Sequence, residues 1–181
     1  MPDALEMLIA DHRKVERLYA DFESSPSTKL VQQICNELTV HAAIEEEVIY
    51  PLLDQLPDGS SMREEAEEEH QEAKDTIAEI EAAGCDPEQT RSMVDTLMES
   101  VNHHVEEEEN EVFPKMRDAL GGERLDSAGQ ELAVAKLQHL RSVVDLEELS
   151  KDELYELAQS AGVDGRSDMA KDDLVKALQR A

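Results

Sequence analysis

The sequence contains few aromatic residues and few basic ones. Aromatic residues make up 3% of the 181 residues, and tryptophan is absent, so the core must be built from aliphatic side chains. Only 17 lysine and arginine residues oppose 44 aspartate and glutamate residues, which gives a formal net charge of -27. A chain this acidic repels phosphate backbones and anionic membranes. The charge therefore argues against nucleic-acid and membrane partners and favours bound cations.

Cysteines and long apolar runs are also scarce. Cys35 and Cys85 lie far apart and form neither a paired metal-binding motif nor a disulfide framework, which suits a reducing compartment. No segment approaches the roughly 20 apolar residues that span a bilayer. The first residues lack a basic stretch followed by an apolar one, so we expect a cytoplasmic protein.

Four segments, which begin near residues 3, 28, 62 and 87, repeat apolar residues at the spacing of a helix. Residues that start or end helices separate them, namely Ser27, the capping-box sequence Ser61 to Glu64, Gly84, Asp86-Pro87 and Gly121-Gly122. Short connections make consecutive helices antiparallel neighbours. The sequence therefore predicts an all-α protein, an up-down-up-down four-helix bundle followed by a helical extension.

One motif occurs twice, in the second and the fourth predicted helix. It consists of the pairs His41/Glu45 and His104/Glu108, each followed by a proline six residues after the glutamate. The two members of a pair are one helical turn apart, so imidazole and carboxylate leave the same helix face. His104 continues the apolar line of its helix, whereas His103 lies on a polar face and is expected at the surface.

Two further histidines, His12 and His70, lie on the apolar stripes of the first and third helices. Counting from the turns at about 1.5 Å per residue places both at the level of the two pairs. A buried carboxylate needs a positive partner, and no lysine or arginine is expected on these inner stripes. A metal would supply the charge, and imidazole with carboxylate suits iron, or manganese as a substitute, better than structural zinc.

These motifs together resemble the hemerythrin-like (HHE cation-binding) family over about residues 3–118. The resemblance is carried by Asp11-His12-Arg13, His41-x3-Glu45, Glu69-His70 and His104-x3-Glu108. It implies a non-haem centre of two iron ions, oxo- or hydroxo-bridged. The implied ligands are His12 and His41 on one iron, His70 and His104 on the other, and bridging Glu45 and Glu108.

One position departs from the oxygen-carrying hemerythrins, which have a second histidine one turn after the histidine of the third helix. Lys74 stands there, so the iron held by His70 and His104 would lack a ligand unless Glu111 or Tyr50 supplies it. An open position favours peroxide or nitric oxide chemistry, iron oxidation or redox sensing over simple O₂ carriage.

The remaining charged residues of the motifs are expected to face water, and the prolines to kink or end their helices beyond the site. The residues expected on solvated faces are Glu46, Glu47, Glu106, Glu107 and Glu109, with His139 also outside the site.

The chain divides by pattern into a bundle (1–120), a helical linker (121–144) and a small helical module (145–181). The module resembles the SAP-like module also found at the N-terminus of the transcription terminator Rho, through residues 149–158 and 165–174. Residues 143–181 contain 10 acidic and 5 basic residues, so we expect a protein partner there and no nucleic acid.

The predicted function is that of a bacterial-type hemerythrin-like protein that binds or reacts with O₂, peroxide or NO, in redox sensing or protection against oxidative and nitrosative stress. One alternative is a metal-stabilised interaction or regulatory scaffold that uses residues 145–181, and another is an iron-handling protein. The residues leave open whether the protein is an enzyme. Catalase-like peroxide decomposition and ferroxidase activity are the candidate reactions.

Overall fold

The computed structural model describes residues 2–147 and 149–180, which are almost entirely helical and include no strand. The predicted all-α class is therefore confirmed. The elements are α1 (Ala4–Ser24), α2 (Thr28–Ile44), η1 (Glu45–Ile49), α3 (Tyr50–Leu53), α4 (Gly59–Ala82), α5 (Pro87–Glu107), η2 (Glu108–Val112), α6 (Phe113–Val143), α7 (Lys151–Ser160), η3 (Arg166–Asp168) and α8 (Lys171–Leu178). Within these ranges, no helix is both long enough and apolar enough to span a bilayer.

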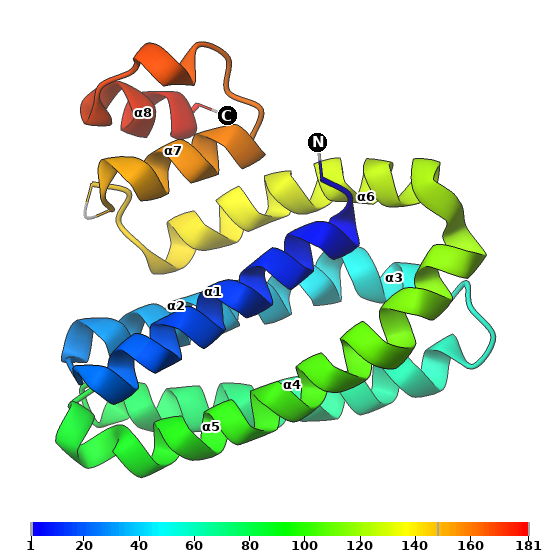
Figure 1. The fold of residues 1–181 in the computed structure, drawn as a ribbon, viewed down its shortest axis with the longest axis horizontal. Helices are drawn as coiled ribbons and strands as arrows, with labels where there is room; N and C mark the ends of the chain where they lie inside the picture. The colour runs from blue at the N-terminus through cyan, green and yellow to red at the C-terminus, as the bar shows by residue number, and fades with distance from the viewer. Residues whose placement is uncertain (1, 148, 181) are drawn as a thin grey trace.

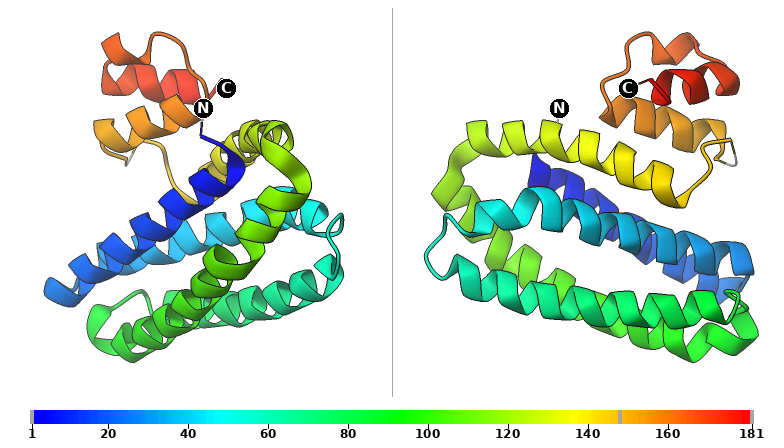
Figure 2. Two further views of the ribbon diagram at one scale, coloured as in Figure 1. Left: turned by 45° about the vertical axis from the view of Figure 1, so that its right-hand side comes forward. Right: turned by 180° about the vertical axis from the view of Figure 1, so that it is seen from behind.

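Four antiparallel rods form the predicted bundle (Figure 1). The first is α1, the second is α2 with its continuation through η1 and α3, the third is α4, and the fourth is α5 with its continuation through η2 into α6. Helix α1 packs on α2 and helix α4 packs on α5. The views in Figure 2 show these two pairs facing each other along their lengths.

The helix starts are set by caps and by one close backbone contact. Ser27 and Asp86 accept backbone hydrogen bonds at the starts of α2 and α5, as the sequence predicts. The predicted start of the third helix at Ser61 is wrong, because α4 already begins at Gly59. A Cβ atom at position 59 would lie 1.7 Å from the carbonyl oxygen of Leu53, so glycine permits a start that the capping pattern does not show.

The helix that begins at Phe113 is interrupted at Gly121, as the sequence predicts, because the backbone there is not helical. Gly121 has φ 74° and ψ 166°, which bends the chain sharply, and the helix then runs back across the bundle to Val143 (Figure 1). This second part packs on α1 and α2. Gly129 permits a close approach, since a Cβ atom there would lie 3.0 Å from the carbonyl oxygen of Pro2. The predicted domain boundaries at residues 120 and 144 stay predictions.

The C-terminal helices α7 and α8 pack against each other beside the end of α6 (Figure 1). Ser150 and Glu153 form a reciprocal capping box at the start of α7. Leu154 and Leu174 are fully buried and belong to the apolar cluster that also contains α6. Of the predicted module at 145–181, Glu148 and Ala181 lie outside the described residues, and its resemblance to SAP-like modules stays a prediction.

The apolar core consists of two clusters. One joins the start of α1, the end of α2, α3 and α6 with the C-terminal helices, and includes Leu8 and Ile44. The other joins the end of α1 and the start of α2 with α4 and α5, and includes Val15 and Leu97. His12 lies between Leu8 and Val15 along α1, at the boundary of the two clusters. The buried histidine, aspartate and glutamate residues of the bundle thus form a layer between two apolar regions.

Candidate metal centre

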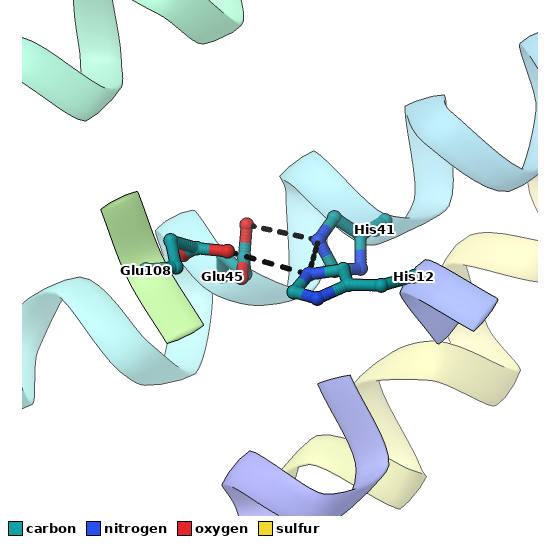
Figure 3. A group of neighbouring side chains, drawn as sticks. All are labelled: His12, His41, Glu45 and Glu108. Carbon is teal, nitrogen blue, oxygen red and sulfur yellow. Dashed lines mark hydrogen bonds and ion pairs between the residues drawn. The ribbon is translucent and has the colours of Figure 1, made fainter. Parts of the chain in front are cut away.

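The structure brings together all six residues that the sequence singles out as ligands, each at most 8% exposed. Their donor atoms form two groups, and within each group all of these atoms lie within 4.8 Å of one another. The groups are His12, His41, Glu45 and Glu108, shown in Figure 3, and Glu45, His70 and His104. Glu45 belongs to both groups, so the two groups adjoin. The assignment of these residues as ligands stays a prediction.

The histidines face each other in two pairs through their Nε2 atoms. The Nε2 atoms of His12 and His41 are 3.3 Å apart, and those of His70 and His104 are 3.2 Å apart. Oε2 of Glu45 lies 3.3 Å from Nε2 of both His41 and His70. The Glu45 carboxylate therefore contacts one histidine of each pair.

Glu108 completes the arrangement from the opposite helix. Its Oε2 atom lies 3.3 Å from Nε2 of His12, and its Oε1 atom lies 3.7 Å from Nε2 of His104. Glu108 thus contacts the histidine of each pair that Glu45 leaves uncontacted. Each of the two carboxylates therefore contacts one histidine of each pair.

Each histidine turns its outer nitrogen, Nδ1, towards a second carboxylate. The Nδ1 contacts are His12 with Glu109 at 2.8 Å, His104 with Glu69 at 2.6 Å, His70 with Glu46 at 3.2 Å, and His41 with Asp11 at a longer 3.9 Å. An ionised carboxylate only accepts hydrogen bonds, so Nδ1 carries the hydrogen where such a bond forms and the Nε2 lone pair points inward. Outer carboxylates orient metal-bound histidines in this way.

The prediction that Glu46 and Glu109 face water is wrong. The Glu109 side chain is 20% exposed and accepts hydrogen bonds from His12 and Arg13. The Glu46 side chain is 35% exposed and contacts His70. Sequence reasoning missed all four outer carboxylates, although a usable signal exists. Each is an acidic residue directly beside a candidate ligand in the chain.

Both motifs end in one π-helical turn, η1 and η2, a feature frequent at functional sites. The N–H of Tyr50 bonds to the carbonyl of Glu45, and the N–H of Phe113 bonds to that of Glu108, five residues back in each case. The next residue is proline in both copies. Proline clashes with the carbonyl four residues earlier in an α-helix, and the wider turn relieves this clash. The helix of the first copy then ends at Leu53, two residues after Pro51, whereas the helix of the second copy continues past Pro114.

The position of the absent histidine stays outside the centre. Nζ of Lys74 lies 2.5 Å from Oε1 of Glu46, at the rim. Glu111 does not fill the gap, because the π-turn directs it outward and its side chain is 70% exposed. Tyr50 is buried, with its hydroxyl 2.9 Å from Nδ1 of His70. Within the described chain, Tyr50 is therefore the candidate that lies beside His70, while Lys74 and Glu111 lie outside the centre.

Comparison with known proteins decides the family. A family model described as the hemerythrin HHE cation binding domain matches residues 3–116, which include all six candidate ligands. The chain belongs to the hemerythrin HHE family. Its C-terminal helices α7 and α8 lie outside the matched residues.

Two curated relatives are similar to most of this chain. The chain is 30% identical over 135 residues to a protein named DNA nickase from Nostoc sp.. It is 28% identical over 124 residues to an uncharacterized hemerythrin-like protein from Schizosaccharomyces pombe. The alignments cover 72% and 65% of this chain but 38% and 61% of the two relatives, so the chain spans less than two thirds of either. No solved structure matches the chain.

The opposite charges in the hemerythrin centre shift the pKa values of its buried histidines and of Glu45. Burial lowers the pKa of His41, but Glu45 and other carboxylates outweigh it and raise the pKa to about 9. Burial likewise opposes charge on His104, and Glu69 and Glu108 raise its pKa to about 9. Burial would raise the pKa of Glu45, but the histidines hold it well below its usual range. In the metal-free protein, the protons on these histidines therefore balance the charge of the buried carboxylates.

Unsatisfied polar atoms support a metal in this hemerythrin domain. Among the described residues, both carboxylate oxygens of Glu45 and Oε2 of Glu108 are buried without a hydrogen-bond partner. Such atoms are costly inside a protein unless a cation or hydrogen bond compensates them. Imidazole and carboxylate donors without thiolate fit iron or manganese. The residues therefore fit a metal centre, and the chain is a metal-binding hemerythrin-like protein.

A small cavity of about 40 Å³ borders all four imidazoles. A single water needs on the order of 10–15 Å³, so the cavity accommodates a molecule of two or three atoms. Apolar side chains complete much of its wall, namely Val15, Leu38, Ala42, Ala73, Met98, Val101 and Val105. The hemerythrin centre thus borders a space that suits small, weakly polar ligands.

Proposed function

We propose that the protein holds two iron ions and that this centre binds or reacts with O₂, peroxide or NO, in redox sensing or in protection against oxidative or nitrosative stress. The main support is the buried set of four imidazoles and two carboxylates, several of whose oxygens have no hydrogen-bond partner among the described residues, beside a small cavity. Bound iron supplies one-electron chemistry and an exchangeable position for a small ligand.

The side chains of the centre have complementary roles in this proposal. Nε2 of each histidine offers a lone pair inward, while the outer carboxylates fix the rings. Glu45 and Glu108 span the two metal positions. Burial, Glu45 and Glu108 raise the pKa of Tyr50, so its phenol keeps its proton and can donate a hydrogen bond beside His70. The apolar cavity wall limits access of water.

Replacement of the bridging carboxylates tests this proposal. Glu45→Gln and Glu108→Gln keep the shape of the side chains but remove the negative charge between the histidine pairs. We expect both variants to lose iron while keeping their helical circular dichroism. Glu47→Gln, which removes an equal charge from the half-exposed pair of Glu47 with His139, should keep its iron. Full iron in both bridge variants would overturn the ligand assignment.

Optical spectroscopy tests the reactivity. We expect the iron-loaded protein to absorb in the near ultraviolet and to change its spectrum when peroxide or NO is added. Glu108→Gln should lose both the absorption and the response. Iron-loaded protein whose spectrum and oxidation state are unchanged by O₂, peroxide and NO would refute the proposed chemistry and leave metal binding intact.

A second candidate is a metal-stabilised scaffold that binds a protein partner through its C-terminal helices. It is favoured by the packing of α7 and α8 on the bundle, which shares one apolar cluster with them. The acidic excess of residues 143–181 favours a basic protein surface over nucleic acid. Removal of residues 149–181 distinguishes the two candidates. It should leave peroxide and NO responses unchanged under the first proposal and abolish partner binding under the second.

A further inference from the structure

Outside the buried centre, a second cluster of metal-binding side chains lies on the surface of α4 and α5. We propose that Glu69, His103 and Glu107 form an outer site that captures a divalent cation and delivers it to the buried centre. This inference rests on the proposed metal centre. It assigns a role to His103, which the ligand set of that centre leaves unused.

The geometry of the outer site suits a hydrated divalent ion. One ligand atom from each of Glu69, His103 and Glu107 lies within 4.8 Å of the other two. Nε2 of His103 is 3.3 Å from Oε1 of Glu107, and the His103 side chain is 67% exposed. One imidazole and two carboxylates are ligands for Fe²⁺, Mn²⁺, Co²⁺ or Zn²⁺. Because the site is open, the ion can keep water on its remaining positions and leave again.

Glu69 connects the outer site to the buried centre. Its Oε2 atom accepts a hydrogen bond from Nδ1 of His104 at 2.6 Å, while a carboxylate has a second oxygen free to bind a cation. His103 and His104 are consecutive residues, so the outer and inner imidazoles leave the same turn of α5 on different faces. The outer ion would thus lie one side chain away from the proposed ligand His104.

A pocket of about 100 Å³ provides a path between the two places. Glu69 and Glu107 line it, and so do the buried residues His104 and Glu108. Glu108 is 5% exposed. Its Oε1 atom lies 3.7 Å from Nε2 of His104, and its Oε2 atom, which faces His12, has no hydrogen-bond partner among the described residues. The Glu108 carboxylate at the inner wall would therefore hold a cation that passes through this pocket towards the histidine pairs. The pocket therefore links an exposed set of cation ligands to a buried one.

Charge along this path favours cations over neutral or anionic molecules. The pocket is lined by more glutamates than basic side chains, which are Lys115 and His104. The glutamates are Glu65, Glu69, Glu107, Glu108 and Glu111. A cleft lined by one sign of charge concentrates ions of the opposite sign and speeds their association by factors of roughly 10 to 1,000. Capture at the outer site should therefore set the rate of metal uptake.

Uptake kinetics test the inference with a matched pair of variants. The test variant is His103→Ala with Glu107→Gln, which leaves Glu69 in place as the partner of His104. The control is His139→Ala with Glu47→Gln, another surface pair, 2.8 Å apart, between α6 and η1. Both double variants remove one imidazole and one negative charge. Metal-free full-length protein is mixed with Fe²⁺ without oxygen, and unbound Fe²⁺ is followed with a colorimetric chelator.

We expect the test variant to take up iron roughly 3- to 10-fold more slowly than wild type and to reach the same final iron content. The control variant should match wild type in its rate of iron uptake and in its final iron content. Equal rates in all three proteins, or equal slowing of both variants, would overturn the outer site while leaving the buried centre standing. A wild-type protein that takes up no iron would instead overturn the proposed function, and this inference with it.

Discussion

Metal binding to the buried centre should release protons, because two of its histidines are protonated in the metal-free protein and a metal-bound imidazole nitrogen is not. Carboxylates raise the pKa of His41 and His104 to about 9 against the effect of burial. At pH 7 each imidazole is then about 99% protonated and must lose that proton to offer Nε2 to a metal. These two residues should release about two protons per chain. Two histidines with an ordinary pKa of about 6.5 would release about half a proton together.

The same protons stabilise the fold of the metal-free protein. The folded pKa of each histidine lies above its unfolded value of 6.5, so the stabilisation is complete below pH 6.5 and is lost as pH rises through about 9. At about 1.4 kcal/mol per pKa unit, the loss is on the order of several kcal/mol. The melting temperature of the metal-free protein should fall across this range. The metal-loaded protein should change little, because metal has already replaced the protons.

Calorimetric titration measures the released protons directly. Metal-free protein is titrated with Mn²⁺ or Zn²⁺, which avoid oxidation by air, in two pH 7 buffers that differ in ionisation enthalpy. The difference in heat gives the number of protons. His104→Ala should lower that number by about one, while His139→Ala should leave it unchanged. Release of half a proton or less by wild type, with metal bound, would refute the charge assignment.

Three further changes test the surroundings of the centre. Glu69→Gln should weaken metal binding roughly 10- to 100-fold in a competition with a chromophoric chelator, because Nδ1 of His104 loses its carboxylate; unchanged affinity would contradict that role. Tyr50→Phe should keep the metal content but slow the response to peroxide or NO about 3- to 10-fold in stopped-flow absorbance, and equal rates would remove Tyr50 from the reaction. Leu132→Ala should destabilise the whole bundle by roughly 2–5 kcal/mol in chemical denaturation, whereas a separate transition confined to α6 would show that α6 is not part of the core.

The main features of the centre could be predicted from the sequence because helix periodicity fixes which side chains face inward. His41 and Glu45 share a face by their spacing, and apolar neighbours select His104 over His103. The candidate ligands on all four helices lie at similar distances from the turns, so they meet at the same height along the bundle axis. The structure has all six side chains buried together, and His103 exposed.

The outer carboxylates could not be predicted in the same way because a run of glutamates has no periodic signal. Glu46 and Glu47 look alike in the sequence, yet one contacts His70 and the other contacts the surface residue His139. Glu111 lies within the second π-turn, where ordinary helix counting no longer gives the face, and it points outward. Such a turn is set by the clash of a downstream proline and by tertiary packing, and ordinary helix counting does not include it.

The start of α4 at Gly59 and the direction of α6 after Gly121 depend on contacts between distant elements. The sequence predicts the interruption at Gly121 but not the direction of the chain after it, which follows from the apolar surface that the second part of α6 buries on α1 and α2. Gly59 begins α4 early because the carbonyl of Leu53 leaves no space for a side chain. Both features depend on packing that exists only after the bundle has formed.

The most direct test of the two-iron centre is the metal content of the protein purified from iron-replete cells without a metal-affinity tag. We expect about two iron ions per chain, bound through the two histidine pairs, and a melting temperature that falls when a chelator removes them. Protein that contains no iron, and whose melting temperature is unmoved by the chelator, would contradict the existence of the centre.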